Sequence, residues 1–432
     1  MPIILKFLTA QTAVITRTGW AFLGTLAYAL SQFLILVVLN KFGNESMVGQ
    51  FALGLAIVNP IILFSRMGLR ALQLADSHDE FGFRDYLGTI CSTNLCALGC
   101  CGGVALFYRK EAGVIGTVAA LALFKAVESV TEMYQARMQK QERNRVLARF
   151  QVVRAVLFLT VLALTVNWTG DLNSALFALT LTAVVSLLGL EIRSSLVSWE
   201  SISDVLPRWQ GDVVWQLAQR AWPLGITIVL FTMKSSFPRL FLENQQGKAS
   251  LGIYAALSYV VMAGALFEAA VGQIATPRLA RYNKTGQHKA FRLLQRRTAL
   301  ILGCVGLVGI LTFALAGRWS LQLAFGDKYA AHTQVGLWLS VAMAVNLLTS
   351  SWGCAATARG LLRGQPIILM IVTTIETGAC ALLIPSFGLL GAAWAAVIGA
   401  VALFSGYVML NRWNPSTELE LPQPVAAAKA AA

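Results

Sequence analysis

The chain has 432 residues, of which 57% are hydrophobic and only 12% are charged, about half the charged fraction of an ordinary soluble domain. Its formal net charge is +14, but the basic residues lie in short joints between long apolar runs and form no separate basic domain, which excludes a nucleic-acid-binding module. The composition therefore predicts an integral membrane protein.

The sequence contains about a dozen apolar runs, each close to the roughly 20 residues that a helix needs to cross a bilayer. The joints between them are short, so we expect no large external domain. The pattern predicts an all-α integral membrane protein with twelve transmembrane helices. In chain order these lie over residues 18–39, 48–72, 85–107, 112–136, 148–167, 172–197, 214–241, 250–276, 296–316, 330–356, 365–385 and 388–411.

The basic residues indicate the orientation of these helices. If the N-terminus is cytoplasmic, the cytoplasmic segments hold roughly three times as many Lys and Arg residues as the outer joints, as the positive-inside rule requires. An even number of spans then brings the C-terminus back to the same side. We therefore predict that both termini are cytoplasmic.

The two halves of the sequence resemble each other. The segment that starts at "GWAFLGTLAYAL" and the one that starts at "AWPLGITIVLFT" each read as a long span, a polar joint, and then a Gly-x-aromatic-Ala motif that opens the next span. Six-span repeats of equal orientation are typical of transporters whose site lies between two lobes. We predict a MATE-like arrangement with an N-lobe over 1–200, a cytoplasmic linker over 201–213, a C-lobe over 214–412 and a disordered tail over 413–432.

The sequence carries no pattern typical of an enzyme or of an ATP-driven pump. "NQQGKAS" lacks the upstream glycine of a phosphate-binding loop, and no zinc-protease or serine-hydrolase motif occurs. All seven cysteines lie in predicted spans, without the histidine or second cysteine pair of a metal site. We therefore expect no enzyme activity, no metal and no cofactor.

Ionisable side chains within membrane spans are costly, so each is a candidate for a functional role. Lys125 and Glu128 are three residues apart and share one face of the predicted helix 112–136. Lys234 has no carboxylate within one turn of its own helix, so it needs a distant partner or a ligand. The remaining candidates are the basic residues Arg66, Arg70 and Arg239 and the acidic residues Glu268 and Glu376.

These charged residues also have simpler interpretations. Lys125 and Glu128 can merely neutralise each other, and Arg66, Arg70 and Arg239 can extend their side chains to the membrane surface. Arg70 lies at the predicted cytoplasmic rim, which favours this interpretation for it. Glu376 fits either proton or cation coupling or a structural hydrogen bond.

Asn59 and Pro60 lie in the middle of the second predicted helix. Proline lacks the N–H that would bond to the carbonyl of Ala56, so the helix is loosened there. The pair is therefore either a hinge above the basic end of this helix or a passive kink.

Residues 49–90, "GQFALGLAIVNPIILFSRMGLRALQLADSHDEFGFRDYLGTI", resemble the region from the second to the third span of bacterial polysaccharide biosynthesis transporters. These are Wzx-type flippases of the multidrug/oligosaccharidyl-lipid/polysaccharide (MOP) superfamily. The matching features are Gly49-x-Phe51-Ala52, Pro60, Gly68-Leu69-Arg70 and Ala75-Asp76. The basic joint at 133–157 is also similar.

The resemblance implies a V-shaped, two-lobed bundle in the bacterial inner membrane. Such a flippase moves an oligosaccharide carried on undecaprenyl diphosphate from the cytoplasmic to the outer leaflet, and a polysaccharide polymerase or export machinery is a possible partner. Cations offset a diphosphate, so we predict that the basic candidates contact cargo and that Glu128, Glu268 and Glu376 couple its movement to an ion. Of all the charged residues named above, the family pattern itself covers only Arg70 and Asp76.

Two other functions remain open. A drug or organic-cation exporter of the same superfamily would use acidic cavity groups, against which the placement of Lys125, Lys234 and Arg239 argues. A membrane-embedded polysaccharide polymerase or ligase would need a sizeable outer loop, and the predicted outer joints are short.

Overall fold

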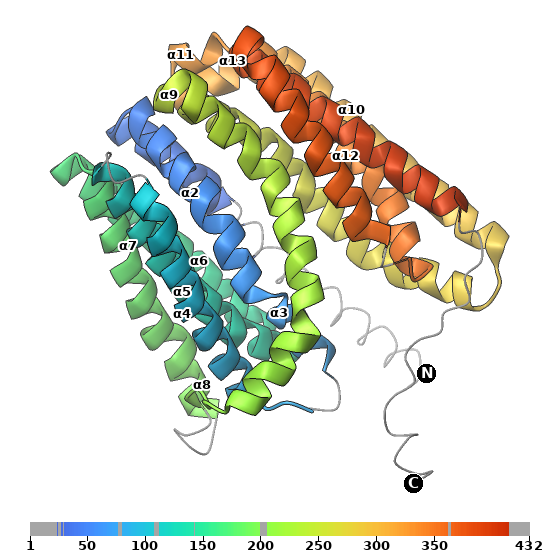
Figure 1. The fold of residues 1–432 in the computed structure, drawn as a ribbon, viewed down its shortest axis with the longest axis horizontal. Helices are drawn as coiled ribbons and strands as arrows, with labels where there is room; N and C mark the ends of the chain where they lie inside the picture. The colour runs from blue at the N-terminus through green and yellow to red at the C-terminus, as the bar shows by residue number, and fades with distance from the viewer. Residues whose placement is uncertain are drawn as a thin grey trace, which may run out of the picture. The chain divides into compact units, whose positions relative to one another are not determined.

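The computed structural model describes residues 24, 27–28, 30–76, 80–107, 112–141, 143–198, 205–361 and 364–413. Within these ranges all regular secondary structure is helical, so the predicted all-α fold is confirmed (Figure 1). A short apolar helix, Leu30–Phe42, precedes the labelled ones. These are α2 (Glu45–Arg66), α3 (Leu69–Ala75), α4 (Phe83–Phe107), α5 (Ala112–Lys140), α6 (Asn144–Thr169), α7 (Leu172–Ser186), the π-helix η1 (Leu187–Ile192), α8 (Arg193–Ser198), α9 (Gly211–Lys284), α10 (His288–Phe325), α11 (Asp327–Ala330), α12 (Thr333–Ala358) and α13 (Gly364–Trp413).

Nine helices in the described part of the chain are long and apolar enough to cross a membrane. This count supports a multi-pass membrane protein and does not confirm the predicted number of twelve. Two helices exceed what one crossing requires, since α9 has 74 residues and α13 has 50. Each is interrupted by a kink at a glycine with non-helical angles: Gly247 (φ 78°, ψ 179°) in α9 and Gly388 (φ 57°, ψ −128°) in α13.

Local sequence explains several helix ends. The Asn44 side chain accepts a hydrogen bond from the Met47 N–H at the start of α2, and Asp171 does the same for the Ser174 N–H at the start of α7. The α2 helix ends at Arg66 because Met67 and Gly68 both adopt left-handed angles (φ 46° and 68°). The predicted helix 48–72 is therefore divided into α2 and α3.

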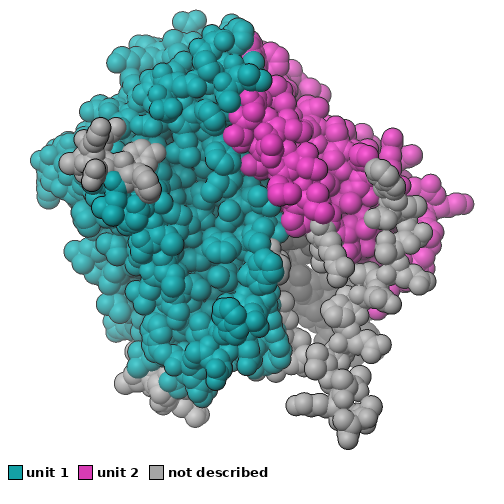
Figure 2. Space-filling view, in the orientation of Figure 1, with its two compact units in different colours: residues 1–259, 318–335, 380–392 teal, residues 260–317, 336–379, 393–432 magenta. Residues whose placement is uncertain are grey.

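The chain packs into two compact units (Figure 2). Unit 1 comprises residues 1–259, 318–335 and 380–392, and unit 2 comprises residues 260–317, 336–379 and 393–432. The predicted lobes, 1–200 and 214–412, follow a different division and stay a prediction. Residues 201–204 of the predicted linker and 414–432 of the predicted tail lie outside the described residues.

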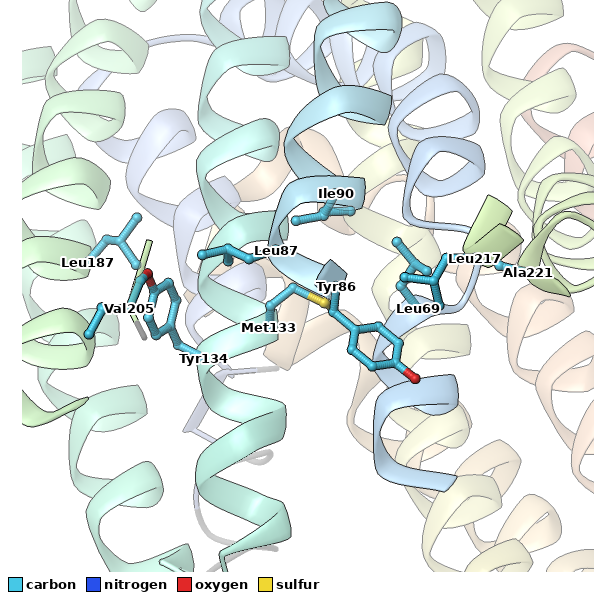
Figure 3. Packing of buried hydrophobic residues seen from close by; sticks show 10 residues of the cluster. All are labelled: Leu69, Tyr86, Leu87, Ile90, Met133, Tyr134, Leu187, Val205, Leu217 and Ala221. Carbon is cyan, nitrogen blue, oxygen red and sulfur yellow. The ribbon is translucent and has the colours of Figure 1, made fainter. Parts of the chain in front are cut away.

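An apolar cluster in unit 1 joins α3, α4 and α5 to η1 and to the start of α9 (Figure 3). The Tyr134 O–H also donates to the carbonyl of Val205 at 2.7 Å. Burial of apolar surface contributes roughly 25 cal/mol per Å², so this cluster fixes the start of α9 against the first half of the chain. Its members are Leu69, Tyr86, Leu87, Ile90, Met133, Tyr134, Leu187, Val205, Leu217 and Ala221.

Two glycines bring α2 and α9 into backbone contact within unit 1. A Cβ built on Gly49 would lie 1.7 Å from the carbonyl oxygen of Lys248, and one built on Gly252 would lie 2.5 Å from that of Glu45. Only glycine permits an approach this close. Gly49 and Gly252 occupy equivalent places in the repeated Gly-x-aromatic-Ala motif, so the contact is symmetric with respect to the repeat.

Candidate functional site

Four charged side chains of α2 and α5 lie together in unit 1, and we call Arg66, Lys125, Glu128 and Glu132 the α2–α5 charge cluster. Arg66 is the last residue of α2. The other three are spaced three, four and seven residues apart on α5, which puts them on one face of that helix.

Arg66 makes three hydrogen bonds to α5. Its Nε donates to the Ser129 hydroxyl at 2.8 Å, its Nη1 to Glu132 Oε1 at 2.7 Å and its Nη2 to the carbonyl of Lys125 at 3.3 Å. The Arg66 side chain is 14% exposed and that of Glu132 is 27% exposed. The guanidinium therefore lies largely out of water, with its charge balanced by one carboxylate.

Lys125 and Glu128 form the second pair of the cluster. Lys125 Nζ lies 2.7 Å from Glu128 Oε2, and the two side chains are 12% and 6% exposed. The Tyr28 O–H donates to the other Glu128 oxygen at 3.3 Å. The interpretation of Lys125 and Glu128 as a mutually neutralising pair therefore matches the geometry, and Arg66 is neutralised in the same way.

This arrangement defines what the cluster can do chemically. Its two cations and two carboxylates sum to zero formal charge, which suits a site with little solvent. Because Arg66 and Lys125 each already hold a carboxylate, an anionic ligand at either cation would compete with that carboxylate. Protonation of the carboxylate would remove this competition.

A buried amide holds the cluster's helices in register. The Asn94 side chain of α4 accepts a hydrogen bond from the Ser65 hydroxyl at 3.2 Å and donates to the carbonyl of Ala126 at 3.2 Å. Both Ser65 and Asn94 are 4% exposed. Asn94 therefore links α2, α4 and α5 next to Arg66 and Lys125.

The predicted hinge lies within α2. The helix continues through Pro60, which is buried, while Asn59 is half-buried. The break in the helix comes after Arg66 instead, at Met67 and Gly68. Whether Asn59 and Pro60 act as a hinge stays a prediction.

The break after Arg66 separates the two arginines that the sequence puts four residues apart. Arg70 lies on α3, where its Nη2 donates to Gln139 Oε1 at 3.1 Å, and it is half-buried. It therefore contacts α5 nearer the end of that helix than the charge cluster does.

The other predicted site residues lie elsewhere. Lys234 and Arg239 are half-buried on α9 within unit 1. Glu268 and Glu376 belong to unit 2, and Glu376 is 4% exposed on α13. Gly399 makes room for this carboxylate, since a Cβ there would lie 2.0 Å from Glu376 Oε2. Of the predicted residues, the structure brings Arg66, Lys125 and Glu128 together.

Sequence reasoning missed several partners. Tyr28 and Ser129 are uncharged, so the pattern of charged residues within spans does not indicate them. Arg154 and Glu191 are 7% and 0% exposed and form a buried ion pair. Both lie inside the predicted spans 148–167 and 172–197, so the rule used for the other ionisable residues could have found them.

Asp76, which the family resemblance covers, organises the joint before α4. Its carboxylate accepts hydrogen bonds from the N–H groups of Glu80 and Phe81 at 3.1 and 3.2 Å and from the Tyr86 hydroxyl at 3.3 Å. Burial acts to raise the pKa of Asp76, but these hydrogen bonds outweigh it, so the pKa is lowered. Next to this joint, Arg220 of α9 binds both oxygens of Glu80 at 2.7 and 2.9 Å.

Metal binding has no support in the described part of the chain, where no three His, Cys, Asp or Glu side chains gather in a way that could hold an ion. The seven cysteines are free thiols.

Comparison with known proteins identifies a family. Residues 14–283 match the family described as polysaccharide biosynthesis protein. The chain is also 26% identical over 405 residues to the capsular polysaccharide biosynthesis protein CapF of Staphylococcus aureus, and the similarity covers 92% of this chain and 100% of CapF. A shorter match, 29% identical over 90 residues, covers 18% of this chain and 21% of an uncharacterized protein of Mycobacterium tuberculosis.

Solved structures with a similar fold are transporters. An inward-facing multidrug resistance MATE family transporter of the MOP superfamily has a TM-score of 0.73 and 11% identity, covering 89% of this chain and 94% of that one. An outward-facing MATE transporter has a TM-score of 0.64 and 13% identity, covering 97% of both chains. A MOP superfamily transporter from Pyrococcus furiosus has a TM-score of 0.61 and 12% identity, covering 93% of this chain and 95% of that one. At these identities the likeness concerns the fold.

Proposed function

The chain belongs to the polysaccharide biosynthesis protein family, and from this we propose that it is a flippase that moves a lipid-linked oligosaccharide across the bacterial inner membrane. Family membership and the MATE-like fold point to a transporter rather than an enzyme. The cargo in this proposal is an oligosaccharide on a polyprenyl diphosphate such as undecaprenyl diphosphate. Exposing its hydroxyls and phosphate charges to hydrocarbon is costly, so unassisted transfer is slow.

The main support for this cargo is that the α2–α5 charge cluster contains two largely buried cations, Arg66 and Lys125. Arg66 and Lys125 each lie 2.7 Å from one carboxylate oxygen. A diphosphate offers oxygen acceptors of the same geometry and more charge, and arginine binds phosphate through two parallel N–H donors. The diphosphate would therefore replace Glu132 on Arg66 and Glu128 on Lys125.

The displaced carboxylates supply a route to ion coupling. A carboxylate that has lost its cation in a site with little water is destabilised as an anion and takes up a proton. When the cargo leaves, the proton leaves with it and the ion pairs form again. In this scheme cargo binding and proton uptake alternate in the same cluster, with Lys234, Arg239, Glu268 and Glu376 as further candidates along the route.

We include in the proposal a topology of twelve spans in two repeats, with both termini cytoplasmic. The kinks at Gly247 and Gly388 support counting α9 and α13 as two spans each. The symmetric contact between Gly49 and Gly252 supports two related halves. A polysaccharide polymerase or export machinery on the outer side is the partner that would consume the translocated product.

The decisive experiment follows lipid-linked oligosaccharide in cells that lack this gene. We expect the intermediate to accumulate in the cytoplasmic leaflet, with rescue by the wild type and by the matched control Arg149→Ala, whose side chain is exposed on α6. Arg66→Ala is expected not to rescue. Unchanged intermediates with new sensitivity to cationic drugs would indicate an exporter instead, and shorter polymer with normal translocation would indicate a polymerase or ligase.

A further inference from the structure

A second buried ion pair lies outside the α2–α5 charge cluster. Arg154 of α6 donates through Nη2 to Glu191 Oε1 of η1. The Glu191 side chain is fully buried and that of Arg154 is 8% exposed. Burying two charges costs several kcal/mol for each ion unless the geometry compensates fully. A contribution to stability alone therefore does not explain the pair.

The compensation at this pair is incomplete. Within the described part of the chain, Glu191 Oε2 and Arg154 Nε are buried and have no hydrogen-bond partner. The remaining contact to the carboxylate is long, since Gln135 Nε2 lies 3.5 Å from Glu191 Oε1. A fixed structural carboxylate would use both oxygens. One oxygen of Glu191 is thus left as a place where a proton can bind.

The backbone around Glu191 is also unusual. Residues Leu187–Ile192, "LLGLEI", form a π-helix between α7 and α8, although no proline interrupts the segment. Short π segments are rare and are often found at functional sites. Return of one such turn to α geometry removes an extra residue from the turn and rotates the following side chains by about 100°. Glu191 is the fifth residue of η1, so its position next to Arg154 depends on the π geometry.

Polar and charged groups from α5, α6 and α8 lie around Glu191. From α5, Gln135 contacts Glu191 and the Tyr134 hydroxyl is bonded to the carbonyl of Val205. From α8, Ser194 accepts a hydrogen bond from Arg143, and Arg193 is exposed. From α6, Arg154 forms the ion pair with Glu191. Arg154 is therefore the charged group that a change at Glu191 affects directly.

We propose that Glu191 is a proton-binding site whose occupancy controls whether Arg154 is paired. Protonation turns the carboxylate into a neutral carboxylic acid and breaks the pair. The η1 segment is then free to return to α geometry, and Arg154 is left without its carboxylate. The unpaired guanidinium is a cation that an anionic ligand can bind. This control rests on the proposed function only for the identity of that ligand, because the proton site itself needs no cargo.

Infrared difference spectroscopy of the purified full-length protein in lipid nanodiscs tests this without any cargo. Lowering the pH is expected to add a carboxylic acid C=O band, and Glu191→Gln is expected to remove one component of it. Glu243→Gln is the matched control, a half-buried glutamate of α9 in unit 1, and is expected to keep that component. The double variant Arg154→Met with Glu191→Met removes both charges together, so it is expected to fold and to lack the component even if the single variant does not fold.

An identical band in the wild type, in Glu191→Gln and in the double variant would overturn the proposal. The flippase assignment would still stand in that case, since it depends on lipid-linked oligosaccharide in cells. If Glu191→Gln loses the component while the wild type itself fails to translocate oligosaccharide, the result would support the proton site and contradict the proposed cargo.

Discussion

Gly49 and Gly252 each face the main chain of the other's helix, so α2 and α9 touch through two equivalent backbone contacts. The carbonyls involved, those of Lys248 and Glu45, lie four residues before the two glycines. The contact is thus repeated by the internal symmetry of the sequence. Such a contact leaves no room for a side chain on either helix.

Gly49→Ala is therefore expected to destabilise the protein by about 2 kcal/mol, the usual cost of overpacking. The new Cβ would meet the Lys248 carbonyl, which is main chain and cannot rotate away. Thermal unfolding of the purified protein measures the effect. Gly99→Ala is the matched control, because nothing lies within 4 Å of a Cβ there. Equal melting temperatures for the two variants would contradict a close backbone contact at Gly49.

Arg66→Ala is expected to lower stability by about 1–3 kcal/mol as well as to stop translocation, since it leaves Glu132 partly buried without its cation. The double variant Arg66→Ala with Glu132→Gln removes the unpaired charge. It is expected to recover most of the stability without recovering translocation. Chemical unfolding and the leaflet distribution of lipid-linked oligosaccharide separate the two effects. Recovery of translocation in the double variant would show that Arg66 only holds Glu132.

The Asp76 carboxylate is expected to make stability depend on pH at the acid end. Its pKa is lowered in the folded protein, so its contribution is complete above the unfolded value of about 4 and is lost as the pH falls through the folded value. Asp76→Asn removes this dependence. The difference in unfolding free energy between the wild type and Asp76→Asn is therefore expected to shrink from pH 5 downward. A difference that stays constant over that range would count against the hydrogen-bonded carboxylate.

Gly399→Ala is expected to displace the Glu376 side chain, because the added Cβ would lie 2.0 Å from Oε2 and 2.6 Å from the carboxyl carbon. We expect a loss of about 1–3 kcal/mol in unfolding free energy. The second change Glu376→Ala removes the clash, so the double variant is expected to be no less stable than Glu376→Ala alone. Gly378→Ala, on the same helix with open space around it, is the control. Additive losses in the double variant would argue against direct contact.

Sequence periodicity and the cost of burying charge predict the membrane fold and part of the candidate site. The all-helical membrane fold follows from the apolar runs, and the shared face of Lys125 and Glu128 follows from their spacing on one helix. The pairing of Arg66 with Glu132 joins two helices that are far apart in the sequence, so no local pattern reveals it. The left-handed turn at Met67 was equally hidden, since a methionine rarely adopts a positive φ.

The π-helix around Glu191 could not be predicted from the sequence for a different reason. Its sequence is apolar and free of proline, so it reads as ordinary helix, and the widened turn depends on what Glu191 and its neighbours contact. Arg154 and Glu191 themselves were within reach of the rule applied to Lys234 and Glu376. Both lie near the ends of their predicted spans, where long charged side chains usually extend to the membrane surface and indicate no function.

The apolar cluster packs Leu217 and Ala221 against α3, α4 and α5. The start of α9 is therefore expected to move together with these helices. In the predicted division this segment opens the second repeat, but by packing it belongs to unit 1. A spectroscopic label attached before residue 221 would report the motion of unit 1, and a label between residues 260 and 317 would follow unit 2.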